Sequence, residues 1–301
     1  MHATFRQLKL LLALAESGSI TGAARLCHVT QPTVSMQLRD LSEAVGLPLY
    51  EQLGRTLRLT EAGEALAQTA RAMFDEWEAF AQTVARMKGL EQGRLRIAVA
   101  STAKYFVPRM LGSFFAAHPH IDVSLQVLNR DGVVARMREH RDDLYILSMP
   151  PSGLPLVQQV FLPNPLVVVA PMSHDLATQR RVSLARLQRE PFILREPGSG
   201  TRLACDAHFK AWQFLPRVRL ELGSNEAIKQ SVAAGIGLSV LSRHALAADP
   251  ADDGLAVLPV PHFPVRSSWS ILFPQGRRLS PIAAEFLRHL TEAAKGWEPH
   301  V

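Results

Sequence analysis

Apolar residues recur at helical spacing along the first part of the chain. The pattern predicts one helix over residues 5–17, which Gly18 ends, and a shorter one over residues 21–27. A third helix follows Thr30, which can cap it, and has Pro32 in its first turn, where a missing amide hydrogen removes no helical bond. Its buried face is the apolar stripe of Val34, Leu38, Leu41 and Val45. The segments have the arrangement of a helix-turn-helix.

A hairpin and a long helix follow. Leu49-Tyr50 and Leu57–Leu59 predict two short strands around a turn with a basic tip at Arg55, which is a wing. From Thr60 a helical pattern continues as far as Lys88. One side of this helix is apolar and carries Leu66, Met73, Trp77, Phe80, Val84 and Met87. A second copy of the chain is the simplest partner for that side, so we expect a homodimer.

From residue 94 the pattern alternates between strands and helices. The expected strands are residues 94–100, 122–128, 143–147, 166–170, 192–194, 217–222, 237–241 and 269–273. The expected helices are residues 102–117, 132–139, 184–188, 202–212, 225–234 and 280–294. Such alternation is typical of an α/β fold with a mainly parallel sheet, and two blocks of it predict two lobes with a cleft between them.

The chain of 301 residues is long enough for two domains. We place a winged helix-turn-helix at residues 1–60, a linker and dimerisation helix at 61–90, and a two-lobed α/β domain at 91–301. In the last of these, lobe I comprises residues 94–163 and 269–301, and lobe II comprises residues 164–268.

Composition and charge narrow the class of protein. With 47% hydrophobic and 20% charged residues, the chain is an ordinary globular protein. It shows no export leader and no apolar run near the ~18 residues of a membrane helix, so we expect a cytoplasmic protein without membrane contact. Cys27 and Cys205 lack metal-ligand spacing, which predicts two reduced thiols and no metal site. A net charge of +6 favours a polyanionic partner, although many basic proteins bind no nucleic acid.

Three linked motifs resemble those of LysR-type transcriptional regulators. They are Ser19-Ile-Thr-Gly-Ala-Ala-Arg-Leu, Val29-Thr-Gln-Pro-Thr-Val-Ser, and Arg55 followed by Leu59-Thr-Glu-Ala-Gly63. Their order and spacing are those of the family, and the resemblance covers essentially the whole chain. It implies an N-terminal winged helix-turn-helix, a long linker helix and a periplasmic-binding-protein-like effector domain. The chain departs from the family at Met36 and Gln52, where Arg is frequent, and so loses two potential DNA contacts.

Motifs of the second domain resemble more narrowly the regulators of carbon-fixation operons, which encode Rubisco and other Calvin-cycle enzymes. They are Ser101–Phe106, Asn129–Gly132, Asp142–Ile146, Asn164–Pro171, Leu194–Arg202 and Glu221–Gln230. This resemblance implies control of such an operon. The alternative is a LysR-type regulator of a different metabolic operon.

Candidate DNA contacts lie on the outer side of the third helix and in the wing. The side chains there have the sizes and hydrogen-bonding groups that reach base edges and phosphates. The expected DNA-binding residues are Gln31, Pro32, Thr33, Ser35, Met36, Arg39 and Arg55. The partner is then double-stranded DNA with an inverted repeat, whose half-sites match a two-fold dimer or a tetramer. A plain solvated helix face is the alternative interpretation.

Polar residues also gather where strands of the second domain end. Open α/β sheets bind ligands there, near helix N-termini that offer unpaired N–H groups. The expected effector-binding residues are Ser101, Thr102, Lys104, Asn129, Arg130, Ser148, Arg195, Gly200, Thr201, Arg202, Ser224 and Asn225. Four of them are cationic, so we expect a small anionic or phosphorylated metabolite and no other cofactor. Taken singly, each is also explained as a helix cap or turn residue.

Two other classes of protein compete with a regulator. A solute-binding protein shares the two-lobed half, but it carries an export signal and no helix-turn-helix. An enzyme needs catalytic residues, and we find no GxSxG, HExxH or kinase motif, while the Gly-Ser-Gly-Thr run at 198–201 lacks Walker spacing. A loop explains His118 and His120 better than a metal does. We therefore predict a regulator without catalytic residues, with RNA polymerase as a further candidate partner.

Overall fold

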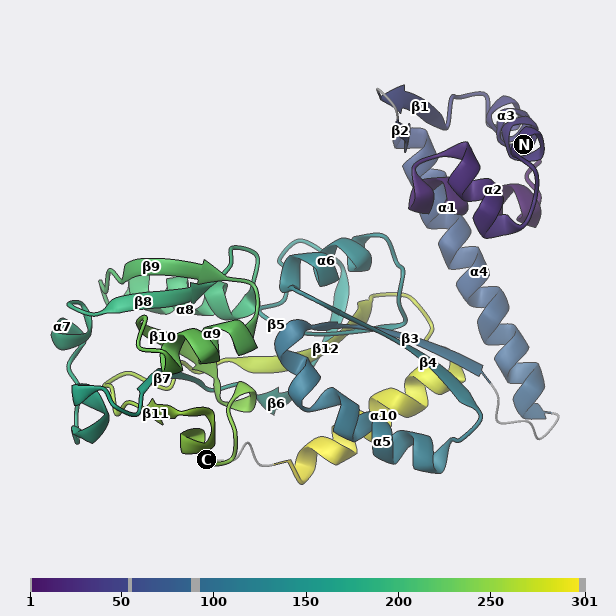
Figure 1. Ribbon diagram of the computed structural model, residues 1–301. Coiled ribbons are helices and arrows are strands. Elements are labelled where there is room, and N and C mark those ends of the chain that lie inside the picture. Colours follow the sequence, from purple (N-terminus) through teal and green to yellow (C-terminus); the bar gives the residue numbers. More distant parts are fainter. Residues whose placement is uncertain (1, 54–55, 88–92, 298–301) are drawn as a thin grey trace. The chain divides into compact units, whose positions relative to one another are not determined.

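A computed structural model describes residues 2–53, 56–87 and 93–297 of the chain. They form two compact units, residues 1–83 and 84–301 (Figure 1). The division falls within the long helix α4 (Glu61–Met87). Of the helices that the structure describes, none combines the length and the hydropathy that a membrane crossing requires.

The first unit contains three short helices and a hairpin. Helices α1 (Phe5–Ser17), α2 (Ile20–Cys27) and α3 (Gln31–Val45) precede the antiparallel strands β1 (Tyr50–Leu53) and β2 (Thr56–Leu59). Each helix begins at a hydroxyl side chain that accepts a backbone N–H of the first turn, and these caps are Thr4, Ser19 and Thr30. The stripe on α3 is buried at Val34, Leu38 and Leu41 and half-buried at Val45. The winged helix-turn-helix is confirmed.

Backbone contacts tie the wing to α4. The backbone N–H of Thr60 donates to the Leu49 carbonyl at 3.1 Å, and the Thr60 hydroxyl donates to the Pro48 carbonyl at 2.7 Å. The same hydroxyl accepts the N–H of Gly63 at 3.1 Å. A Cβ atom on Gly63 would lie 1.9 Å from the Leu49 carbonyl oxygen. Thr60 and Gly63 therefore explain the Leu-Thr-Glu-Ala-Gly motif as the joint between wing and helix.

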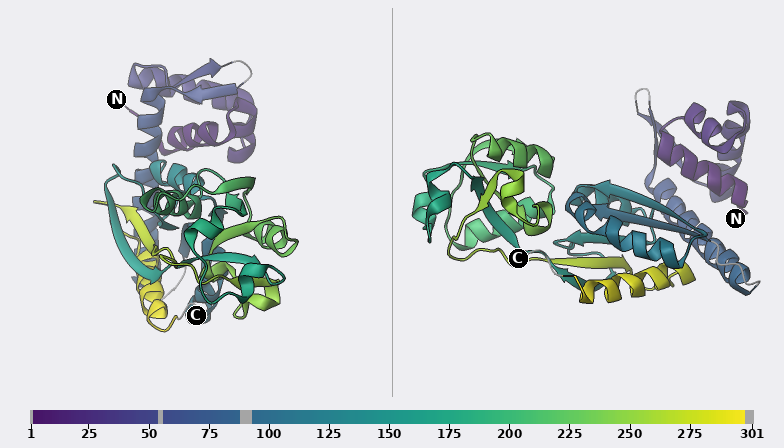
Figure 2. Two further views of the ribbon diagram at one scale, coloured as in Figure 1. Left: turned by 90° about the vertical axis from the view of Figure 1, so that its left-hand side faces the viewer. Right: turned by 60° about the horizontal axis from the view of Figure 1, so that its bottom comes forward.

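The second unit has two lobes, and in its described residues each lobe is built on a five-stranded sheet. The strands of lobe I are β3 (Gly93–Ala100), β4 (Ile121–Leu128), β5 (Leu144–Ser148), β6 (Leu156–Pro163) and β12 (Ser268–Pro274). Their order is β4-β3-β5-β12-β6, with the first three parallel and the last two antiparallel to their neighbours. Helix α6 (Arg130–Arg138) covers one face, and α5 (Val107–Ala117) and α10 (Pro281–Lys295) cover the other (Figures 1 and 2).

Lobe II repeats this plan. Its strands are β7 (Leu166–Pro171), β8 (Pro191–Arg195), β9 (Arg217–Leu222), β10 (Leu238–Ser242) and β11 (Leu255–Val257), in the order β11-β7-β10-β8-β9. Helix α8 (Gly200–Ala211) packs on one face through Cys205 and Phe209, and α9 (Asn225–Ala233) packs on the other through Ile228 and Val232. The short helix α7 (Leu184–Leu187) lies before β8. The two-lobed α/β fold is confirmed.

Two chain segments join the lobes. The Asn164 N–H donates to the Ser267 carbonyl at 2.8 Å, and Leu166 forms an antiparallel bridge with Val265. Asn164 is buried, and its side-chain oxygen accepts the Ser242 hydroxyl at 2.6 Å. The crossing segments therefore lie side by side and are held together by hydrogen bonds.

The structure corrects three expectations about the second domain. The helix expected over 102–117 is divided into a 3₁₀ helix, η1 (Ser101–Tyr105), and α5, because Pro108 has no N–H to donate to the Lys104 carbonyl of a continuous helix and lies instead in the first turn of α5. Strand β6 is absent from the sequence prediction, since Gln158 and Gln159 interrupt its apolar pattern. Each described sheet is mixed and not mainly parallel, because at one end of the sheet two strands pair antiparallel with their neighbours.

Candidate DNA-binding surface and effector cleft

Helix α3 presents its expected DNA-binding residues on the side opposite its buried stripe. Gln31, Pro32, Met36 and Arg39 are exposed, and Met36 reaches 54% exposure. Thr33 and Ser35 are half-buried, and the Thr33 hydroxyl lies 2.8 Å from that of Thr30 in the helix cap. Arg55 lies outside the described residues. The described part of the surface thus carries polar groups, one cation and one exposed thioether.

A second exposed surface of the first unit is apolar. Trp77 and Phe80 on α4 are 61% and 58% exposed, and Phe5 from α1 is 47% exposed. The Trp77 ring centroid lies 5.9 Å from those of Phe5 and Phe80. Together with Met73 they line a groove of predominantly apolar surface, which we call the aromatic groove. Large clustered aromatic side chains in water are typical of an association surface.

The guanidinium of Arg195 is the centre of the contact between the two lobes. Arg195 ends β8 in lobe II and is 2% exposed. It donates to Asn225 Oδ1 at 2.8 Å within its lobe and to Ser101 Oγ of lobe I at 3.2 Å. Asn225 Nδ2 in turn donates to Thr102 Oγ1 at 3.1 Å. Four predicted effector residues from both lobes therefore form one network, in which Thr102, Arg195 and Asn225 are buried.

The N-terminal turn of α8 meets lobe I beside this network. A Cβ atom on Gly200 would lie 2.8 Å from the Ser148 hydroxyl oxygen at the end of β5. Gly198, in the left-handed region with φ of +85°, accepts the backbone N–H of Asp131 at 3.2 Å. Ser148 and Thr201 are both buried. Glycine thus allows the loop before α8 to approach lobe I at backbone distance.

Charged residues bridge the lobes at the edge of the network. Lys104 Nζ in η1 lies 2.7 Å from Glu226 Oε2 in α9, and the Tyr105 hydroxyl donates to Glu226 Oε1. Partial burial alone would raise the pKa of Glu226, but the hydrogen bonds from Lys104 and Tyr105 outweigh it and lower the pKa to about 2. Burial and the bond to Glu226 raise the pKa of Tyr105. Glu226 is therefore a carboxylate at neutral pH and Tyr105 a neutral donor.

Every predicted cation of the cleft has a carboxylate partner. Arg195 pairs with Glu196 at 2.8 Å, Arg130 with Asp131 at 2.8 Å and Arg202 with Asp206 at 2.9 Å. Lys104 pairs with Glu226, as described above. Each of the four predicted cations is thus neutralised by a neighbouring carboxylate.

The remaining predicted residues have local roles in the structure. Asn129 accepts the Gly132 N–H at 2.9 Å and caps α6, and Ser224 accepts the Ala227 N–H at 3.4 Å and caps α9. Their roles as effector contacts stay predictions. The sequence analysis missed Tyr105 and Glu226, which directly follow the predicted residues Lys104 and Asn225. No sequence signal near Lys104 points to Glu226, which lies 122 positions away along the chain.

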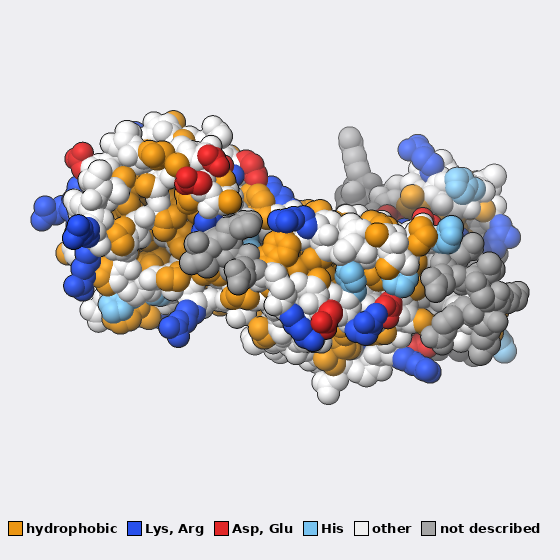
Figure 3. All heavy atoms as spheres, turned by 90° about the horizontal axis from the view of Figure 1, so that it is seen from below, with side chains coloured by type: hydrophobic (Ala, Val, Ile, Leu, Met, Phe, Trp, Pro, Cys, Tyr) orange, Lys and Arg blue, Asp and Glu red, His pale blue; other side chains and the backbone are white. Residues whose placement is uncertain are grey.

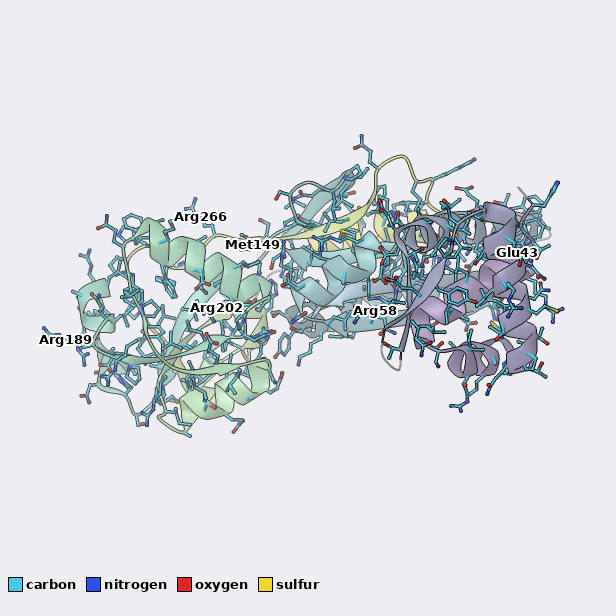
Figure 4. All side chains as sticks on the ribbon, turned by 90° about the horizontal axis from the view of Figure 1, so that it is seen from above. Glu43, Arg58, Met149, Arg189, Arg202 and Arg266 are labelled. Atoms are coloured by element: carbon cyan, nitrogen blue, oxygen red, sulfur yellow. The ribbon has the colours of Figure 1, made fainter. Side chains whose placement is uncertain are left out.

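Many other arginines of lobe II lie away from the cleft. Lysine and arginine side chains follow the outer edge of the lobe in Figure 3. Arg180, Arg181 and Arg189 are exposed, and Arg189 lies at the end of lobe II farthest from lobe I (Figure 4). Met149, in contrast, lies where the lobes meet, and its carbonyl accepts the Arg130 Nε at 2.6 Å (Figure 4).

Comparison with known proteins identifies the family. Within the described residues no group of three or more His, Cys, Asp or Glu side chains could hold a metal ion. Residues 5–64 match the bacterial regulatory helix-turn-helix proteins of the lysR family, and residues 88–295 match the LysR substrate binding domain. The chain is a LysR-type transcriptional regulator.

The relatives of this chain include a regulator of the RuBisCO operon. The RuBisCO operon transcriptional regulator of Acidithiobacillus ferrooxidans is 44% identical over 99% of this chain and 96% of its own length. The transcriptional activator CmpR of Synechocystis is 43% identical over 96% of this chain and 95% of its own. The CcmR regulatory domain of Synechocystis, solved in complex with 2-PG, is 48% identical with a TM-score of 0.66 over 68% of this chain and 99% of its own. The resemblance to regulators of carbon-fixation operons is confirmed.

Proposed function

We propose that this regulator controls a carbon-fixation operon and that a small anionic, phosphorylated metabolite binds between lobes I and II. The buried network of Ser101, Thr102, Arg195 and Asn225 carries the proposal. It joins hydroxyl, amide and guanidinium groups from the two lobes, and phosphate and carboxylate oxygens accept hydrogen bonds from groups of these kinds. The similarity to CcmR, which was solved with 2-PG, supports the same ligand class.

The proposed parts of the chain have separate roles. Residues 1–60 bind double-stranded DNA at an inverted repeat, residues 61–90 associate two copies through the aromatic groove, and residues 91–301 bind the effector. An effector that prefers one arrangement of the lobes shifts the protein towards it, because a ligand changes an equilibrium only through different affinities for its states. The protein then acts in the cytoplasm without catalytic turnover, and RNA polymerase is its proposed partner at the promoter.

Thermal unfolding with and without 2-PG tests the effector. A ligand at about 100 times its dissociation constant stabilises the native state by about 2.7 kcal/mol, which raises the melting temperature of the second unit. Thr102→Val keeps the side-chain shape but removes a hydroxyl of the network, so we expect a smaller shift. Thr178→Val, at an exposed position of lobe II, is the matched control and should shift like the unmodified chain. Equal shifts for both variants would contradict the proposed site.

Selection of genomic DNA tests the operon. The purified protein is incubated with fragments of its own genome, and bound fragments are sequenced. We expect enrichment upstream of carbon-fixation genes, with a footprint that changes when 2-PG is added. Enrichment upstream of another metabolic operon would assign the regulator there and reject the carbon-fixation proposal.

A further inference from the structure

Lys104, a solvent-accessible cation of the proposed cleft, is already paired with a carboxylate of the protein. Lys104 is 38% exposed and its partner Glu226 is 47% exposed, so solutes in water reach this pair. Arg195 is 2% exposed and its donors are bonded to Glu196, Asn225 and Ser101. An anion that approaches from water therefore meets the Lys104–Glu226 pair before it meets Arg195.

This pair differs from the other ion pairs of the predicted cations. Arg195 and Arg202 of lobe II and Arg130 of lobe I are each paired with carboxylates of their own lobe. Lys104, in contrast, belongs to lobe I and Glu226 to lobe II. Tyr105 of lobe I donates to the second oxygen of Glu226. Among these four cations, only Lys104 has its carboxylate partner on the other lobe.

We infer that Glu226 is a specificity-determining residue for the effector: its carboxylate is a tethered anion that the effector must displace from Lys104 and Tyr105. The inference rests on the proposed function of the cleft. A phosphate or carboxylate group can replace the Glu226 carboxylate, because it accepts hydrogen bonds from the same donors and is also negatively charged. An uncharged polyol offers no equivalent acceptor and leaves the pair intact. The cleft thereby selects for charge although its own cations are neutralised.

A tethered competitor lowers the affinity for every anion. Because Glu226 is linked to Lys104 through the fold, it competes at a high and constant effective concentration. Its removal should free Lys104 and tighten binding by about fivefold, the upper range for an exposed ion pair. Glu226→Gln keeps the size of the side chain and its position in the first turn of α9, while it removes the charge.

Isothermal titration of the full-length protein with 2-PG tests the inference. We expect Glu226→Gln to bind 2-PG about fivefold more tightly than the unmodified chain, and Glu226→Asp, which keeps a carboxylate, to restore weaker binding. The matched control is Glu292→Gln, which removes the partner of Lys295 on α10 of lobe I and should leave the affinity unchanged. In a Lys104→Gln background, the Glu226→Gln gain should disappear.

A purely structural role for Glu226 predicts a different result. Loss of an interlobe contact alone would lower the melting temperature without tightening 2-PG binding. If the unmodified chain binds 2-PG and Glu226→Gln binds it equally or more weakly, the inference fails and the proposed effector class stands. If neither protein binds 2-PG, the effector proposal fails and this inference fails with it. Tighter binding by Glu226→Gln that persists in the Lys104→Gln background also overturns the inference.

Discussion

Replacement of Gly63 by alanine should disrupt the winged helix-turn-helix. Gly63 lies in the first turn of α4 and packs against the backbone that leads into the wing. A Cβ atom there would lie 1.9 Å from the Leu49 carbonyl oxygen and 2.9 Å from its carbon. Both atoms belong to the backbone and Leu49 is fully buried, so no flexible side chain can move aside. The segment must shift by more than an ångström, and the Thr60–Leu49 hydrogen bond must break.

The magnitude follows from two opposing effects. In an unobstructed helix, Gly→Ala stabilises by about 0.5–1 kcal/mol. At Gly63 the overlap costs about 1–3 kcal/mol or more, as for other overpacked sites, and the lost hydrogen bond costs about 1 kcal/mol. Subtracting the helix gain from these two costs leaves a net destabilisation of roughly 1–3.5 kcal/mol. Gly112→Ala is the matched control, because no atom lies within 4 Å of its Cβ position on α5.

Hydrogen exchange read by mass spectrometry separates the two units. Gly63→Ala should lower the protection of peptides from residues 5–60 by about 5- to 300-fold, since about 1.4 kcal/mol corresponds to tenfold. Peptides of β3 and β5 in the second unit should keep their protection. Gly112→Ala should change protection only in lobe I, and upwards. Unaltered protection of residues 5–60 in Gly63→Ala would refute the argument from the close approach.

Two further predictions concern the first unit. Arg39→Ala should weaken binding to a selected DNA duplex and reduce the slope of log affinity against log salt by about 0.9. Met36→Ala should weaken binding but leave the slope unchanged, because of these two side chains only Arg39 can neutralise a phosphate. Equal slopes for both variants, titrated at several salt concentrations, would argue against an Arg39–phosphate contact. Trp77→Ser should shift the sedimentation equilibrium towards smaller species, because the 61% exposed indole belongs to the aromatic groove. Met172→Ser, which also replaces an exposed apolar side chain, should cause no shift. An unshifted equilibrium for Trp77→Ser would exclude the groove as the interface.

The fold of the first unit could be predicted from the sequence because its signals are local. Thr4, Ser19 and Thr30 each cap a helix within three residues of the N–H group that they accept. The stripe from Val34 to Leu41 marks its own buried face through its spacing. Gly63 was recognised only as part of a motif, because the need for glycine there comes from a contact with Leu49, fourteen positions earlier.

The features of the second unit that escaped prediction depend on distant residues. Strand β6 pairs with β12, and Gln158 on β6 bonds to Ser270 on β12. The order of the strands likewise depends on where the chain crosses between the lobes. The partner of Lys104 is 122 positions away along the chain. Nothing local to Lys104 or to Glu226 indicates that the two side chains meet.

The pairing of the cations changes how anion recognition in the cleft has to be understood. Counted from the sequence, Lys104, Arg130, Arg195 and Arg202 are four positive charges that attract an anion by their sum. In the structure each is offset by a carboxylate, so net charge supplies little attraction. Recognition then depends on exchange, in which the ligand must present oxygens where a carboxylate of the protein now lies. Of these four ion pairs only that of Lys104 spans the lobes, so in the proposed mechanism the exchange is also the step at which binding can change their separation.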